Sequence, residues 1–146
     1  MMINYNTDFY GWTQEQAALL KAGRLSDLDI DNLLEEVETM GRSEKRELDS
    51  RLAVLLIHLL KWQYQPVRRG RSGQLTIEGQ RINFSETLEE NPSLEPQLDT
   101  ILKKAYAKSI IKASQETALD KQTFPSVCPW TYSQILDDNF YPDAGE

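Results

Sequence analysis

The stretch "ELDSRLAVLLIHLLKWQYQP", residues 47–66, decides the fold of this chain. Its leucines recur every three to four positions, which places them on one face of an α-helix, and further apolar residues cover most of the other faces. The leucines of that face are Leu48, Leu52, Leu55 and Leu59. Because a helix that is apolar on nearly every side packs against several neighbours, the stretch predicts a central helix over about residues 44–64. Pro66 then ends it, since proline has no backbone N–H.

Helix signals precede this central element. Residues 30–40 place their apolar side chains on one helical face, at Ile30, Leu33, Leu34, Val37 and Met40. Gly41 predicts the end of that helix, and Ser43 is the expected N-cap of the central one. A still earlier helix is expected to begin at Thr13, which has Gln16 at the spacing of a capping box.

Residues 72–90 fit two patterns. Apolar residues alternate on both sides of a Glu-Gly pair, as they do in a β-hairpin with a two-residue turn. However, Ile77, Phe84 and Leu88 also fall on one helical face, at positions i, i+7 and i+11. We expect a helix, because the single Gly79 is only a modest penalty within it.

The rest of the chain completes an all-α prediction. A last long helix is expected after Pro92, and Thr131 with Gln134 predicts a short capped turn. The segment 124–142 holds three prolines and many aromatic residues, so we expect it to pack on the bundle. The prediction is one helical domain over residues 1–146, a bundle of five to six helices around the central apolar helix.

Composition narrows the classes of function. The chain has 146 residues, with 16 Lys and Arg against 23 Asp and Glu, which gives a net charge of −7. This balance argues against general nucleic-acid affinity but leaves a local basic patch open. Neither a signal segment nor an apolar run of about 18 residues is present, so we expect a cytoplasmic protein without a membrane partner. Cys128 is the only cysteine, so neither a disulfide nor a cysteine zinc site is expected, and its expected role is packing.

A polar stripe on the central helix is the first candidate site. Arg51 and His58 project from nearly the same side of the helix, about 10 Å apart along its axis. Their spacing resembles the Arg-His motif of the HEPN superfamily of small helical ribonucleases, which act without a metal. The resemblance implies His58 as general base or acid toward a 2′-hydroxyl and Arg51 as stabiliser of the charged phosphorane. Leu52 departs from that motif, which usually has a polar residue there, and the alternative is an ion pair between Glu47 and Arg51 with His58 bonded within the core.

The second candidate is a basic and aromatic patch that begins at the end of the same helix. Its cations are Lys61, Arg68, Arg69 and Arg71, and Trp62 and Tyr64 lie among them. Positive charge interleaved with aromatic rings suits phosphate binding and base stacking. The alternative is that Trp62 packs in the core and the arginines pair with acidic helices.

A third pattern is an acidic run with the spacing of a calcium loop. Asp27, Asp29, Asp31 and Glu38 occupy positions 1, 3, 5 and 12 of an EF-hand loop. The sixth position needs a glycine for its sharp turn and has Asn32, and the same stretch predicts a helix. We therefore interpret these acids as helix-capping residues, and we expect no metal and no cofactor.

Three stretches together resemble a known family. They are "DFYGWTQEQAALLKAGR", "LDIDNLLEEVETMGRSEKRELDSRLAVLLIHLLKWQYQP" and "CPWTYSQILDDNFYP". They resemble the bacterial domain-of-unknown-function family twenty-nine, which is common in cyanobacteria. The resemblance implies an all-helical fold and favours a helix over residues 72–90, although Gly79 and Asn83 are atypical there. It implies no mechanism.

The sequence therefore predicts an intracellular bacterial helical protein that binds another macromolecule, either RNA or protein. A metal-independent ribonuclease that uses Arg51 and His58 is the alternative. The basic patch between Lys61 and Arg71 and the acidic patch between Asp27 and Glu38 have opposite signs, so a homodimer is also open.

Overall fold

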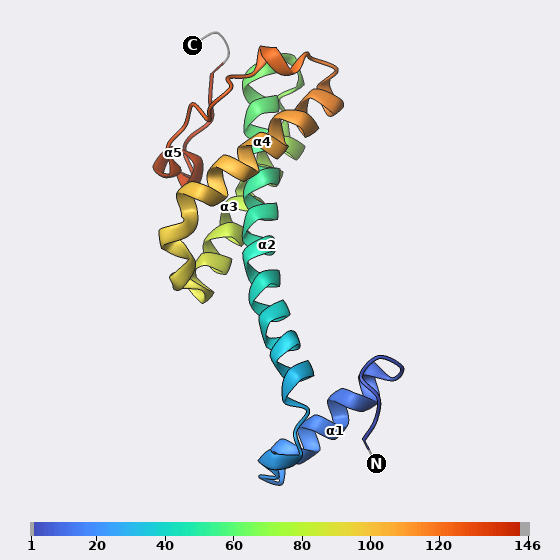
Figure 1. Cartoon of the computed structure of the whole chain (residues 1–146). Coiled ribbons are helices and arrows are strands. Elements are labelled where there is room, and N and C mark those ends of the chain that lie inside the picture. The colour runs from blue at the N-terminus through green and yellow to red at the C-terminus, as the bar shows by residue number, and fades with distance from the viewer. Residues whose placement is uncertain (1, 144–146) are drawn as a thin grey trace. The chain divides into compact units, whose positions relative to one another are not determined.

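The computed structural model describes residues 2–143, which contain helices and no strand. The chain divides into two compact parts, residues 1–43 and residues 44–146, which we name the N-terminal unit and the C-terminal unit. The helices are α1 (Phe9–Lys21), α2 (Ile30–Tyr64), α3 (Arg71–Glu90), α4 (Leu98–Thr117) and α5 (Tyr132–Leu136) (Figure 1). Short 3₁₀ turns join them at Leu25–Asp27, Pro66–Arg68, Pro92–Gln97 and Lys121–Thr123. The predicted all-α fold with a long central helix is confirmed.

α2 is longer than the sequence pattern predicts. The predicted end at Gly41 and the predicted N-cap at Ser43 are wrong, because α2 continues through both residues. A glycine within an exposed helix costs only about 1 kcal/mol relative to alanine, and good helix formers flank Gly41 on both sides. α2 contributes residues to both units.

Other helix boundaries follow local capping chemistry. The predicted start of α1 at Thr13 is wrong, since the Asp8 carboxylate caps the helix by accepting a 3.0 Å hydrogen bond from the Gly11 N–H. The helix predicted over residues 72–90 is confirmed as α3. The capping box of Thr131 and Gln134 is also confirmed, at the start of α5.

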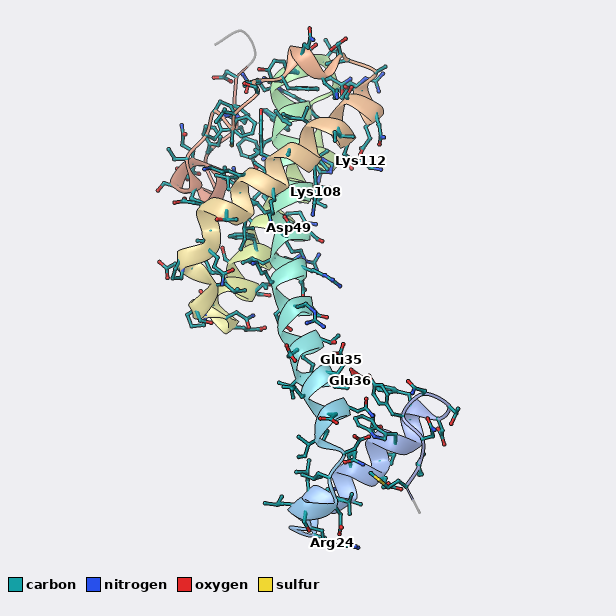
Figure 2. The ribbon with its side chains drawn as sticks, viewed as in Figure 1. Arg24, Glu35, Glu36, Asp49, Lys108 and Lys112 are labelled. Carbon is teal, nitrogen blue, oxygen red and sulfur yellow. The ribbon has the colours of Figure 1, made fainter. Side chains whose placement is uncertain are left out.

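The core of the C-terminal unit is built around α2. Every core leucine of α2 is fully buried, and each stabilises the fold by roughly 1.5–3 kcal/mol. α3 adds Ile77 and Phe84, while α4 adds Ile101, Ala105 and Tyr106. The leucines are Leu48, Leu52, Leu55, Leu56, Leu59 and Leu60. The ion pair between Asp49 of α2 and Lys108 of α4, with an N–O distance of 2.6 Å, lies at the edge of this core (Figure 2).

The C-terminal segment shares the same core. Phe124, Trp130 and Ile135 are buried in it, and Cys128 packs against it as predicted. Burial raises the pKa of the Cys128 thiol, which keeps it protonated and unreactive.

Arg81 of α3 holds this segment in place from inside the unit. Its side chain is buried, and its Nε and Nη2 donate to the carbonyls of Ile135 and Phe140 at 2.8 and 2.6 Å. The guanidinium also lies over the Tyr141 ring, 5.3 Å from its centroid.

The N-terminal unit has a much smaller interior. Trp12 of α1 is its buried aromatic residue, in contact with Tyr5 and Phe9. Trp12 Nε1 donates to the Asp29 carboxylate at 2.9 Å, and the Gln16 side-chain oxygen accepts from the Asp29 N–H at 2.8 Å. These polar contacts fix the turn between α1 and α2.

Candidate functional site

A pocket of about 310 Å³ lies where α2 ends and α3 begins. Three α2 residues contribute, including His58, and the connecting loop and the first turns of α3 supply most of the others. The lining residues are His58, Lys61, Trp62, Gln65, Arg68, Arg69, Gly70, Ser72, Gly73, Thr76 and Glu116. The pocket therefore joins the predicted His58 site and part of the predicted basic patch.

The local sequence explains why these groups converge. Pro66 stops α2, and the short Pro66–Arg68 turn carries the chain directly to α3. α3 starts after an extended Gly70, and no side chain caps it. Its first N–H groups therefore lack a capping partner, and the positive end of the helix dipole lies at the pocket. An uncapped helix start beside several cations is a favourable environment for an anion.

His58 is half-buried in the pocket wall. Burial lowers the pKa of its imidazole below 6.5, the Lys61 ammonium lowers it further, and Glu116 opposes them. The ring is therefore neutral at neutral pH, which leaves one nitrogen able to accept a proton.

Arg51 does not join His58 in this pocket. It forms an i, i+4 ion pair with Glu47, at an N–O distance of 3.5 Å, in which both side chains are exposed. The cationic neighbours of His58 in the pocket are Lys61, Arg68 and Arg69. The structure thus forms the ion pair that the sequence offered as the alternative.

Two of the predicted binding cations also have structural partners. Lys61 pairs with Glu116 of α4 at 3.2 Å. Arg69 donates to the carbonyls of Trp62 and Pro142, at 2.6 and 3.2 Å, so it ties the loop to the C-terminal segment. Arg69 also lies over the Trp62 ring.

The two rings predicted to stack on bases pack against other aromatic rings of the protein. Trp62 lies against Tyr141, with ring centroids 4.9 Å apart, and Tyr64 contacts the ring of Phe124 edge-on at 5.2 Å. Arg68 and Arg71, by contrast, are exposed on the surface. Phosphate contacts are therefore better supported at this site than base stacking.

Sequence reasoning missed several members of the pocket. Gly70, Ser72 and Gly73 carried a readable signal, because "GRSG" combines small residues with a helix start. Glu116 carried none, since it comes from α4 and meets Lys61 across 55 positions of sequence. The arrangement can hold an anion between Arg68 and the start of α3, and it places a neutral imidazole beside it.

Metal-ligating residues do not cluster in the part of the chain that the structure describes. Between residues 2 and 143 there is no group of three or more His, Cys, Asp or Glu side chains able to hold a metal ion. Asp29, from the acidic run, instead accepts hydrogen bonds from Trp12 and from the backbone and side chain of Asn32. These bonds lower the pKa of Asp29 and show the helix-capping role predicted for it. Within the same residues, no helix is long and apolar enough to cross a membrane.

The chain matches the family model described as "Domain of unknown function DUF29" over residues 4–141. The match covers nearly the whole chain, so the protein belongs to this family, and the predicted resemblance is confirmed. No curated protein and no solved structure matches the chain. Membership assigns no function, so the function of the pocket is argued from its own residues.

Proposed function

We propose that this protein binds RNA through phosphate contacts at the pocket between α2 and α3. The observation that carries the proposal is the convergence, in about 310 Å³, of Arg68 with the uncapped start of α3. Arg71, in the first turn of α3, adds a further exposed cation beside the pocket. Cations and a helix N-terminus together form a phosphate-binding environment.

The surroundings of the pocket determine the mode of binding. Because Trp62 and Tyr64 pack against other rings, the contacts are to phosphate rather than to base faces. Phosphate contacts carry no sequence information, so binding tolerates many sequences. The net charge of −7 repels RNA elsewhere on the surface and confines it to this site.

Salt-dependent binding of a single-stranded RNA tests the proposal. In fluorescence anisotropy, Arg68→Ala and Arg71→Ala should each weaken binding about three- to tenfold, with a reduction of about 0.7 in the slope of log K against log salt concentration. Lys103→Ala and Lys104→Ala are matched controls, because both lysines are exposed on α4 and cause the same loss of charge. Equal effects of all four variants, or no binding by the wild type, would refute the proposal.

A metal-independent ribonuclease is the second candidate, favoured by the neutral His58 in the same pocket. A neutral imidazole suits removal of a proton from a 2′-hydroxyl. In this candidate Arg51 would leave Glu47 and stabilise the charged phosphate. RNA should then be cleaved in the presence of a chelator, and both His58→Ala and Arg51→Ala should abolish cleavage. Intact RNA after incubation with the wild type would exclude the enzyme and leave the binding proposal standing.

A further inference from the structure

An open apolar surface runs along the part of α2 that belongs to the N-terminal unit. Ile30, Leu34, Val37 and Met40 are spaced as one helical face, which we name the N-terminal apolar face. Their exposed fractions are 61%, 57%, 57% and 60%. The sequence pattern placed Leu33 on the same face, but Leu33 is half-buried, whereas the other four side chains are open to solvent. Contiguous apolar surface of this kind marks an interaction site.

The N-terminal unit also has too small an apolar core to be stable without further burial. Among residues 2–43, Trp12 is the only buried apolar side chain. Phe9, Tyr10, Leu20 and Leu25 are exposed in addition to the apolar face. Units of about 40 residues rarely bury enough surface to be stable alone, so an occupant that covers the face would stabilise this one.

Charge next to the face defines the chemistry of that occupant. Acidic residues outnumber basic ones by eight to three in residues 1–43. Asp31 and Glu38 flank the apolar face by their helical positions. Glu36 of the same helix adds further negative charge, whereas Glu35 is paired with Arg42 at 3.6 Å (Figure 2).

A hollow of about 880 Å³ continues the surface at the start of α2. It shares Ile30 and Asp31 with the face and its acidic rim, and Glu15 and Asp27 also line it. Arg24 lines it too and neutralises Asp27 through an ion pair at 2.7 Å. The Glu15 carboxylate accepts from the Ile3 N–H, at 3.3 and 3.1 Å to its two oxygens. The exposed Asp31 therefore supplies the carboxylate that can receive a cationic side chain of a partner.

We propose that the N-terminal apolar face docks a basic amphipathic helix of a partner protein. The apolar side of that helix lies along Ile30, Leu34 and Val37, as in other helix-in-groove complexes. Its Lys and Arg residues pair with Asp31 and Glu38, and one of them enters the acidic hollow. A second copy of the N-terminal unit fits less well, because it brings the same excess of negative charge to the interface. This site shares no residue with the RNA pocket, so each proposal is tested without the other.

Binding of a labelled helical peptide tests the proposal with the full-length protein. The probe is a peptide of leucine and lysine with its leucines on one helical face. A scrambled peptide of the same composition removes that face, and a peptide of leucine and glutamate reverses the charge. The leucine–lysine peptide should bind at least about tenfold more tightly than either control, a difference of about 1.4 kcal/mol. Added salt should weaken its binding.

Three variants of the N-terminal apolar face and its acidic rim, with two controls, identify the surface. Leu34→Ser and Val37→Ser should each weaken peptide binding about tenfold, and Asp31→Asn should weaken it about threefold. Ile82→Ser and Ile111→Ser are the matched apolar controls, since both side chains are exposed in the C-terminal unit, and they should leave binding unchanged. Circular dichroism of each variant checks that the helical content is kept.

Three results would overturn the proposal. Equal binding of the scrambled peptide would reduce the interaction to nonspecific charge. If Leu34→Ser and Val37→Ser left peptide binding unchanged, the peptide would bind elsewhere on the surface. Finally, sedimentation of the free protein as a dimer that Leu34→Ser dissociates would make a second copy the occupant, in line with the homodimer that the sequence left open.

Discussion

The two ends of α2 carry the same apolar spacing and meet different surroundings. Between Leu48 and Leu60 the leucines are fully buried, because α3, α4 and the C-terminal segment cover the helix on several sides. Between Ile30 and Met40 every apolar side chain except the half-buried Leu33 is more than half exposed. Amphipathic spacing thus predicts that a face will be covered, and whether the covering comes from the same chain depends on the rest of the fold.

The largest expected difference between the two ends is in unfolding free energy. Leu56→Ala should lower it by about 2–5 kcal/mol, because the fully buried side chain leaves a cavity in the core. Leu34→Ala should change it by less than about 0.5 kcal/mol, because the side chain is 57% exposed. Urea denaturation followed by circular dichroism measures both. Similar losses for the two variants would mean that the N-terminal apolar face is covered in the free protein.

The next largest effect concerns the hydrogen bonds by which Arg81 holds the C-terminal segment on the core of its unit. Arg81→Ala should lower the unfolding free energy by about 2–4 kcal/mol, since it leaves the carbonyls of Ile135 and Phe140 without their donors. Limited proteolysis should then cut within residues 130–143 sooner. Arg71→Ala, at an exposed position of the same helix, is the control and should leave both readouts nearly unchanged. If Arg81→Ala left the unfolding free energy unchanged, the segment would be held by its apolar contacts alone.

A smaller effect tests the continuity of α2 between its two ends. Gly41→Ala should stabilise the helix by about 0.5–1 kcal/mol, because alanine has the better helix propensity and a β-carbon there would meet no atom within 4 Å. Amide hydrogen exchange of residues 38–44 should slow about two- to fivefold. Faster exchange in the variant would indicate that Gly41 adopts a non-helical conformation.

The smallest effect is the pH dependence due to His58. Its pKa in the folded protein lies below 6.5, mainly because burial disfavours the charged ring. As pH falls below 6.5, the unfolded chain therefore takes up a proton on this ring before the folded protein does. The unfolding free energy is unaffected by His58 above that pH and falls as pH drops toward the lowered pKa of the folded protein. Between about pH 7.5 and pH 5.5, wild type should lose more unfolding free energy than His58→Asn. An identical loss in both proteins would show that the ring is not penalised by burial.

Much of the C-terminal unit could be predicted from sequence because its signals are local. The leucine spacing of α2 and the stop at Pro66 need no knowledge of other elements. Arg81 shows where this reasoning ends. It occupies position i+4 of the stripe that begins at Ile77, yet a pattern of apolar residues does not report a buried arginine. Its burial depends on the carbonyls of Ile135 and Phe140, which lie 54 and 59 positions away.

The candidate site, too, could be predicted only where its residues are close in sequence. His58, Lys61 and Arg68 come together because they follow one another at the end of a helix and its loop, which the sequence displays directly. His58 and Arg51 were predicted to act together because they project from nearly the same side of the helix. The long arginine side chain reaches Glu47 instead. The packing of Trp62 depends on Tyr141, and no local pattern reports such a contact.

Amide hydrogen exchange along α2 tests the contrast between its two ends most directly. In the free protein, amides of residues 50–60 should exchange only with global unfolding, and amides of residues 34–40 should exchange at least about a hundredfold faster. Addition of the leucine–lysine peptide should slow exchange in residues 34–40 and leave residues 50–60 unchanged. Uniform protection along the whole of α2 in the free, monomeric protein would contradict the account.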